Sequence, residues 1–156
     1  MSTASVPFNA PSPVSRPRGV TILASLALVG GTLGAIGSVA LLGFGHLANV
    51  PELQQALPSA SAAQLLGIIV QIAGIFLLLG SAVHLAFGVG ALQLRGWAWT
   101  LGVAAQGFGI VTNVVGLSGV LAGHGGGAGS LPGLALSAFI LWYLYRPTVR
   151  RAFGHA

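Results

Sequence analysis

The chain of 156 residues has no cysteine, no lysine and no aspartate, and Glu52 is its one acidic residue. Without cysteine, thiolate metal sites, iron–sulfur clusters and catalysis through a cysteine pair are excluded. Without aspartate there is no Ser-His-Asp triad, and general acid–base catalysis needs a positioned titratable group. Charged residues make up 4% of the chain, against about 25% in soluble domains. We therefore expect a membrane protein that is not an enzyme and holds no cofactor or metal.

Apolar residues dominate what is present, at 54% of the chain. An apolar helix needs about 20 residues to cross the hydrocarbon core of a bilayer. The sequence predicts an all-α membrane protein, a four-helix transmembrane bundle with up-down-up-down order. The four spans are predicted at residues 20–42, 64–92, 97–122 and 129–145. They lie in one domain, 16–146, between a disordered cytoplasmic tail, 1–15, and a short basic cytoplasmic tail, 147–156.

The basic residues are distributed on one side of these spans. All six are arginines, and they precede the first span, separate the second from the third, or follow the fourth: Arg16, Arg18, Arg95, Arg146, Arg150 and Arg151. Cytoplasmic loops collect Lys and Arg, and aromatic residues gather at membrane interfaces. Aromatic residues stand beside Arg95 and Arg146: Trp97, Trp99, Trp142, Tyr143 and Tyr145. We predict a protein of the cell (inner or plasma) membrane with both termini cytoplasmic and arginines at the lipid headgroups.

The net charge of +5 raises the question of a nucleic-acid partner. Such partners require basic residues clustered on one face, whereas these arginines lie at helix ends. We therefore expect the lipid bilayer as the partner of the arginines, and no nucleic acid.

A cleaved signal peptide is the alternative interpretation of the N-terminus, because Arg16 and Arg18 precede an apolar run. That run extends over residues 20–44, whereas the apolar part of a signal peptide has about 7–15 residues. We therefore expect a retained first helix.

Small residues recur every three or four positions in the first three spans. The predicted packing positions are Gly30, Gly34, Gly37, Gly67, Gly74, Ser81, Gly88, Gly102, Gly109 and Gly116. In lipid, small residues at this spacing allow two helix backbones to approach closely. Only residues 93–96, which include Arg95 and Gly96, separate the second and third spans, and so short a connection predicts an antiparallel hairpin. These rows of small residues provide more close-packing surface than one small bundle needs. We therefore expect self-association or an accessory role in a membrane complex.

A polar cluster is predicted inside the spans, formed by Gln71, His84, Gln106 and Asn113. His84 is the one ionisable residue among them, and such residues are functional candidates. We expect a hydrogen bond between His84 and Gln106, with Asn113 one heptad further along. The simpler interpretation is that all four join helices, at about 0.6–2 kcal/mol per bond. A small transporter or channel using the His84, Gln106 and Asn113 face is an alternative, and a haem- or pigment-binding subunit through His84 is a weaker one.

The remaining histidines give no metal site. His46 and His124 are expected at the external ends of the first and third spans, but with Glu52 distant they lack the three or four ligands of zinc. His155 is expected in a frayed tail. Residues 146–153 are expected to lie on the inner leaflet as a basic amphipathic segment.

Three short stretches carry a resemblance: Arg18-Gly-Val-Thr-Ile-Leu-Ala24, Gly96-Trp-Ala-Trp-Thr-Leu-Gly102, and Tyr143-Leu-Tyr-Arg-Pro-Thr-Val-Arg-Arg-Ala-Phe-Gly154. Together they resemble a group of small uncharacterised four-span bacterial integral membrane proteins. The resemblance implies the same four-span topology. It implies no activity and no catalytic residues.

Overall fold

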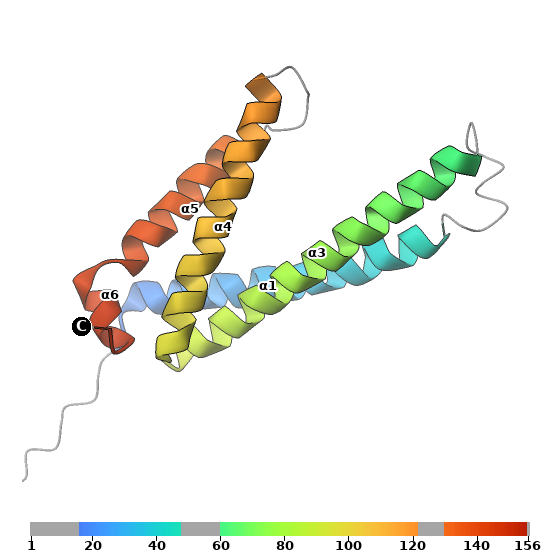
Figure 1. Ribbon diagram of the computed structural model, residues 1–156. Helices are drawn as coiled ribbons and strands as arrows, with labels where there is room; N and C mark the ends of the chain where they lie inside the picture. The colour runs from blue at the N-terminus through green and yellow to red at the C-terminus, as the bar shows by residue number, and fades with distance from the viewer. Residues whose placement is uncertain (1–15, 48–59, 122–129, 156) are drawn as a thin grey trace, which may run out of the picture.

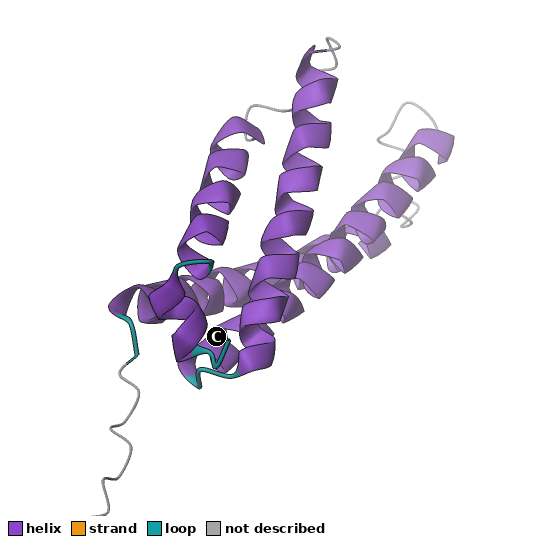
Figure 2. Ribbon diagram, turned by 60° about the vertical axis from the view of Figure 1, so that its left-hand side comes forward, coloured by secondary structure: helices purple, strands orange, loops and turns teal. Residues whose placement is uncertain are grey.

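The computed structural model describes residues 16–47, 60–121 and 130–155, and within them the chain is helical apart from short connections (Figure 2). The helices are α1 (Arg18–Leu47), α3 (Ala60–Leu92), α4 (Gly96–Leu121), α5 (Ser130–Leu144) and α6 (Pro147–Ala152). The predicted all-α class is confirmed. The predictions for the tail 1–15, the loop containing Glu52 and the segment containing His124 lie outside the described residues.

Three of these helices, α1, α3 and α4, are long and apolar enough to cross a membrane. The fourth, α5, has 15 residues and is apolar but shorter, at about 22 Å for a rise of 1.5 Å per residue. α1 begins two residues before the predicted span and continues five residues beyond it, to Leu47. The short helix α6 lies in the segment predicted to be a tail.

The long helices are paired as two antiparallel hairpins. α1 packs along α3, and α4 packs along α5, whereas α3 and α4 share a much smaller contact. The two hairpins meet beside α6 and diverge away from it (Figure 1). The second view shows the same divergence. The arrangement is therefore more open than the predicted bundle, because the hairpins touch at one end.

The seam between α1 and α3 is built where glycine leaves room for a side chain of the other helix. A Cβ atom at Gly88 would lie 2.6 Å from Leu28 Cγ, and one at Gly74 would lie 3.0 Å from Leu42 Cγ. Gly34 contacts Ser81 in the same way. Gly30, by contrast, has nothing within 4 Å of a Cβ position. Gly37 is a fourth predicted glycine in this interface, with a Cβ position 3.6 Å from Leu77 Cδ2, whereas Gly30 borders open space.

The seam between α4 and α5 uses glycine against serine. A Cβ atom at Gly109 would lie 3.0 Å from Ser137 Oγ, and one at Gly116 would lie 2.6 Å from Ser130 Oγ. Gly102 differs, because a Cβ atom there would lie 2.6 Å from Phe87 Cε2 of α3. Small polar side chains in glycine grooves allow the short α5 to approach α4 closely.

The largest buried cluster lies where the hairpins meet. It takes side chains from α1, α3, α4, α5 and the C-terminal segment: Val20, Ala24, Ala91, Ala98, Leu144, Val149 and Phe153. Elsewhere large apolar side chains point outward, as Phe76, Phe108 and Leu33 do. Such extended apolar exposure is rare on a soluble monomer and marks a surface that contacts protein or lipid.

Candidate functional site

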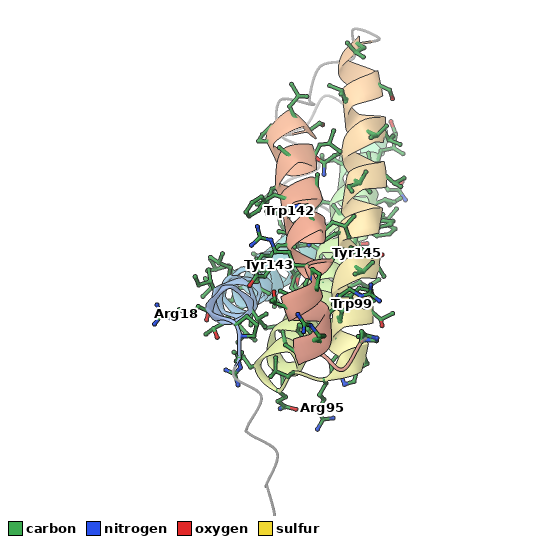
Figure 3. The ribbon with its side chains drawn as sticks, turned by 90° about the vertical axis from the view of Figure 1, so that its left-hand side faces the viewer. Arg18, Arg95, Trp99, Trp142, Tyr143 and Tyr145 are labelled. Carbon is green, nitrogen blue, oxygen red and sulfur yellow. The ribbon has the colours of Figure 1, made fainter. Side chains whose placement is uncertain are left out.

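Two regions are candidates for function. The first is the arginine end, which we define as residues 16–20, 91–99 and 142–155, where the hairpins and α6 meet. Figure 3 shows Arg18, Arg95, Trp99 and the aromatic residues of α5 at this end. The second is the inter-hairpin groove, an apolar hollow between α3 and α4 that we describe below.

Trp99 connects three segments at the arginine end. Its indole Nε1–H donates a hydrogen bond of 2.9 Å to the carbonyl of Leu144, one of the last carbonyls of α5, which lack partners within their own helix. Its ring lies edge-on to Tyr145, with centroids 5.4 Å apart, and 4.7 Å from the ring of His155. One α4 side chain therefore holds the end of α5 and the C-terminal segment.

The C-terminal segment is folded against the helices. Pro147 starts α6 at a position where proline is favoured because no N–H is needed. Val149 and Phe153, 1% and 3% exposed, enter the buried cluster. His155 Nε2 lies 3.1 Å from the carbonyl of Gly96, and because a carbonyl only accepts, Nε2–H is the donor.

These contacts correct one prediction. His155, expected in a frayed tail, is held by Gly96 and Trp99. The physical reason is that Val149 and Phe153 enter the buried cluster and so fix the segment that carries His155 against the helices. The position of residues 146–153 on the inner leaflet stays a prediction.

Two helix ends at the arginine end close with the same hydrogen-bond pattern. After α3, Leu94 N bonds Ala91 O and Arg95 N bonds Gly90 O; after α6, Gly154 N bonds Arg151 O and His155 N bonds Arg150 O. The pattern requires a left-handed residue, here Leu94 (φ 53°) and Gly154 (φ 77°). Leucine is strained in this conformation, and its packing against the buried cluster offsets the strain.

Other aromatic residues at this end contact arginine or the first helix. The Arg146 guanidinium stands over the ring of Trp142, 4.1 Å from its centroid, a cation–π geometry. The Tyr143 hydroxyl lies against Gly19, where a Cβ atom would have no room. The predicted aromatic residues therefore also join α5 to α1.

The inter-hairpin groove begins where the hairpins diverge, and has a volume of about 400 Å³. It is lined by apolar residues and one histidine: Phe76, Leu79, Gly80, Val83, His84, Leu101, Ala104, Ala105 and Phe108. His84 also lines a second hollow of about 250 Å³ beside Gly30 and Gly34 of α1. Binding sites for apolar ligands or helices typically combine such a lining with few polar groups.

The orientation of His84 is set within its own helix. Its Nδ1 atom lies 2.8 Å from the carbonyl of Gly80, one turn earlier. Since the carbonyl only accepts, Nδ1 carries the proton, and in the neutral ring Nε2 is then an acceptor. The expected hydrogen bond to Gln106 does not form in the described residues, because α3 and α4 diverge and the Nδ1 donor is satisfied by Gly80.

The other two polar side chains lie inside separate hairpins. Gln71 packs on Gly45 of α1, where a Cβ atom would lie 2.6 Å from Gln71 Cγ. Asn113 donates to the carbonyl of Gly109 at 2.7 Å and contacts Gly133 of α5. Gln106 is partly buried on α4 and does not line the groove. The structure thus distributes the four predicted polar residues instead of gathering them on one face.

Sequence reasoning missed several residues that define these regions. Val149, Phe153 and His155 belong to the segment predicted to be a short tail, although two apolar residues four positions apart, Val149 and Phe153, are a helix signal. Gly31, next to the predicted Gly30, faces Leu85 in the α1–α3 seam. The spacing of small residues alone does not decide which of these two neighbouring glycines faces α3.

The fold and these two regions define an all-helical protein with three helices long and apolar enough to cross a membrane. Within the described residues, no three metal-ligating side chains lie together. Comparison with models of protein families, with curated proteins and with solved structures finds no match. The resemblance to four-span bacterial membrane proteins stays a prediction.

Proposed function

We propose that this protein is a non-enzymatic integral membrane protein that packs laterally against another membrane protein, as a homo-oligomer or as an accessory subunit of a membrane complex. The observation that carries the proposal is the inter-hairpin groove. Its walls are apolar, and its opening lies between helices with outward-facing large apolar side chains. A helix of a second membrane protein is its proposed occupant.

The lining of the groove favours a helix. Gly80, Ala104 and Ala105 are small, and small residues let a neighbouring helix approach closely where lipid offers no hydrophobic driving force. Phe76 and Phe108 provide apolar walls. The Nε2 acceptor of His84 offers one hydrogen bond to a donor on the partner, about 0.6–2 kcal/mol in a membrane.

The proposed orientation places both termini in the cytoplasm. It is supported by the position of the arginines, which all occur at the start of α1, between α3 and α4, or after α5. Cytoplasmic loops carry an excess of arginine, and tryptophan and tyrosine gather at the interface. Trp99, Trp142 and Tyr145 lie at that same end (Figure 3).

The test is native mass spectrometry of the full-length protein extracted from its own membranes in mild detergent. We expect several copies, or this chain with another subunit. The Ala104→Phe substitution fills the groove and should reduce the assembled fraction, whereas Ala138→Phe, at an exposed α5 position outside the groove, should leave it unchanged. A monomer of 15.6 kDa without partners would contradict the proposal, and ion or solute flux in liposomes would favour a transporter instead.

A second candidate, a haem- or pigment-binding subunit, is favoured by one observation. Histidines that ligate a metal usually donate their other ring N–H to a carbonyl or carboxylate, and His84 Nδ1 has this relation to Gly80. His84 Nε2 would then be the axial ligand. Titration with haem should produce a Soret band that the His84→Ala variant lacks; an unchanged haem spectrum with the wild-type protein would exclude this candidate.

A further inference from the structure

A hollow beside α6 shares no lining residue with the buried cluster or with the inter-hairpin groove. It has a volume of about 270 Å³ and is lined by Tyr145, Pro147, Arg150, Arg151 and His155. We propose that this hollow is a binding site for a phosphate group, as carried by the headgroup of an anionic phospholipid. The inference rests on the proposed membrane location.

The chemistry of the lining suits a phosphate. Two guanidinium groups offer several N–H donors each, in a planar fork that matches phosphate oxygens. Tyr145 adds a hydroxyl and His155 an imidazole. None of the five lining residues is acidic, and the whole chain has one acidic residue against six arginines. The balance of charge therefore favours an anion supplied from outside the chain.

Much of the site is held in place by contacts within the protein. Arg151 Nε donates to the carbonyl of Pro147 at 3.1 Å, and the two terminal nitrogens of that guanidinium remain as further donors. The Arg150 guanidinium lies 5.8 Å from the Trp99 ring centroid. His155 is fixed by its bond to Gly96. Side chains that are already ordered lose less entropy when a ligand binds.

The depth of the hollow also points to a headgroup. Tyr145 lines it and directly follows α5, and Trp142 and Tyr143 lie in the last turn of that helix. Such aromatic residues mark the level of the headgroups, and basic pockets at the cytoplasmic side of membrane helices bind anionic headgroups. Arg16 and Arg18 lie at the start of α1 and are not among the residues that line this hollow, so we expect only a general attraction to anionic lipid from them.

The test counts lipids bound to the full-length protein by native mass spectrometry after exchange into detergent with equal amounts of phosphatidylcholine and phosphatidylglycerol. The wild type should retain phosphatidylglycerol preferentially. The Arg150→Gln/Arg151→Gln double variant should lose this retention by roughly tenfold, since charge-assisted bidentate bonds are removed. The matched Arg16→Gln/Arg18→Gln variant removes the same charge at the same end and should change it by less than about twofold.

Equal losses in the two double variants, or no loss in either, would overturn the proposal. The single variant Arg151→Gln serves if the double variant misfolds, because Arg151 is exposed; it should also lower retention, and circular dichroism checks that α-helix content is kept. Inorganic phosphate added to the wild type separates the sources of phosphate: displacement of the lipid indicates a site that also takes free phosphate, and retention indicates a lipid site. The same mass spectra give the number of protein copies, so the proposal of lateral packing and the proposal of lipid binding are tested independently.

Discussion

The arginine end and the inter-hairpin groove lie on the same helices but are held in different ways. At the arginine end, side chains from five helical segments are buried together, and Trp99 and His155 add long-range hydrogen bonds. At the groove, α3 and α4 diverge, and each hairpin is held by its own glycine seam. In the part of the chain that the structure describes, the two hairpins are thus joined only at the arginine end. The width of the groove, and whatever binds there, therefore depends on contacts at the arginine end.

The largest expected effect comes from removing the side chain of Phe153, which directly follows α6 and lies in the buried cluster. Phe153→Ala should lower the free energy of unfolding by about 3 kcal/mol, as phenylalanine truncation in a core does. Thermal unfolding in detergent measures this. Phe44→Ala is the control, because Phe44 is 51% exposed. An equal loss in the two variants would show that the arginine end is no more tightly packed than the rest.

The α1–α3 seam offers a matched pair of glycines with opposite expected effects. Gly88→Ala should destabilise by about 1–3 kcal/mol through overpacking, because the new Cβ would lie 2.6 Å from Leu28 Cγ and 3.1 Å from the carbonyl of Ala24. Gly30→Ala has open space and should stabilise by about 0.5–1 kcal/mol through a stiffer helix backbone. Chemical denaturation in mixed micelles gives both values. If Gly30→Ala destabilised the protein and Gly88→Ala stabilised it, the register of α1 against α3 would be wrong.

A smaller effect is expected from the hydrogen bond of Trp99. Trp99→Phe keeps an aromatic ring but removes the donor to Leu144, which should cost about 1 kcal/mol. Hydrogen exchange at the end of α5 should rise in this variant. Trp97→Phe should leave that exchange rate unchanged, since the Trp97 ring is 47% exposed and packs near Gly90 instead. Unaltered protection of α5 in Trp99→Phe would show that the bond does not connect α4 and α5.

The smallest effect on stability is expected at the groove. His84 is exposed and its hydrogen bond lies within its own helix, so His84→Ala should change the free energy of unfolding by less than about 0.5 kcal/mol. The assembled fraction in native mass spectrometry should nevertheless fall. A large loss of stability with unchanged assembly would mean that His84 serves the fold and not a partner.

Several features could be predicted from the sequence because they depend on local properties. Apolar length and the absence of charge predicted the helices α1, α3 and α4, and Arg95-Gly96 predicted the turn between α3 and α4. The prediction that these two helices pair as an antiparallel hairpin is wrong, because α3 packs mainly on α1 and α4 mainly on α5. Spacing of small residues identified Gly34, Gly74 and Gly88, which lie in the α1–α3 seam. The spacing could not show which of Gly30 and Gly31 faces α3, because each of these neighbours has small residues three or four positions away. Only the position of α3 decides that Gly31 meets Leu85.

The expected contact between His84 and Gln106 failed for a tertiary reason. Counting residues outward from the turn places them at similar heights, but height alone does not bring two helices together. Whether they meet depends on how the two hairpins are placed, and α3 and α4 diverge away from the end that they share (Figure 1). The bond from His84 to Gly80 then satisfies the donor locally.

The sequence by itself determined an all-helical protein whose apolar segments are long enough to form spans, with every basic residue near a helix end. These properties follow from composition and from the distance a helix covers per residue. Only the tertiary structure decided that the C-terminal segment packs inward, that the hairpins diverge to leave a groove, and that Arg150 and Arg151 share a hollow with Tyr145 and His155. Those features depend on contacts between residues far apart in the chain, which no local pattern encodes.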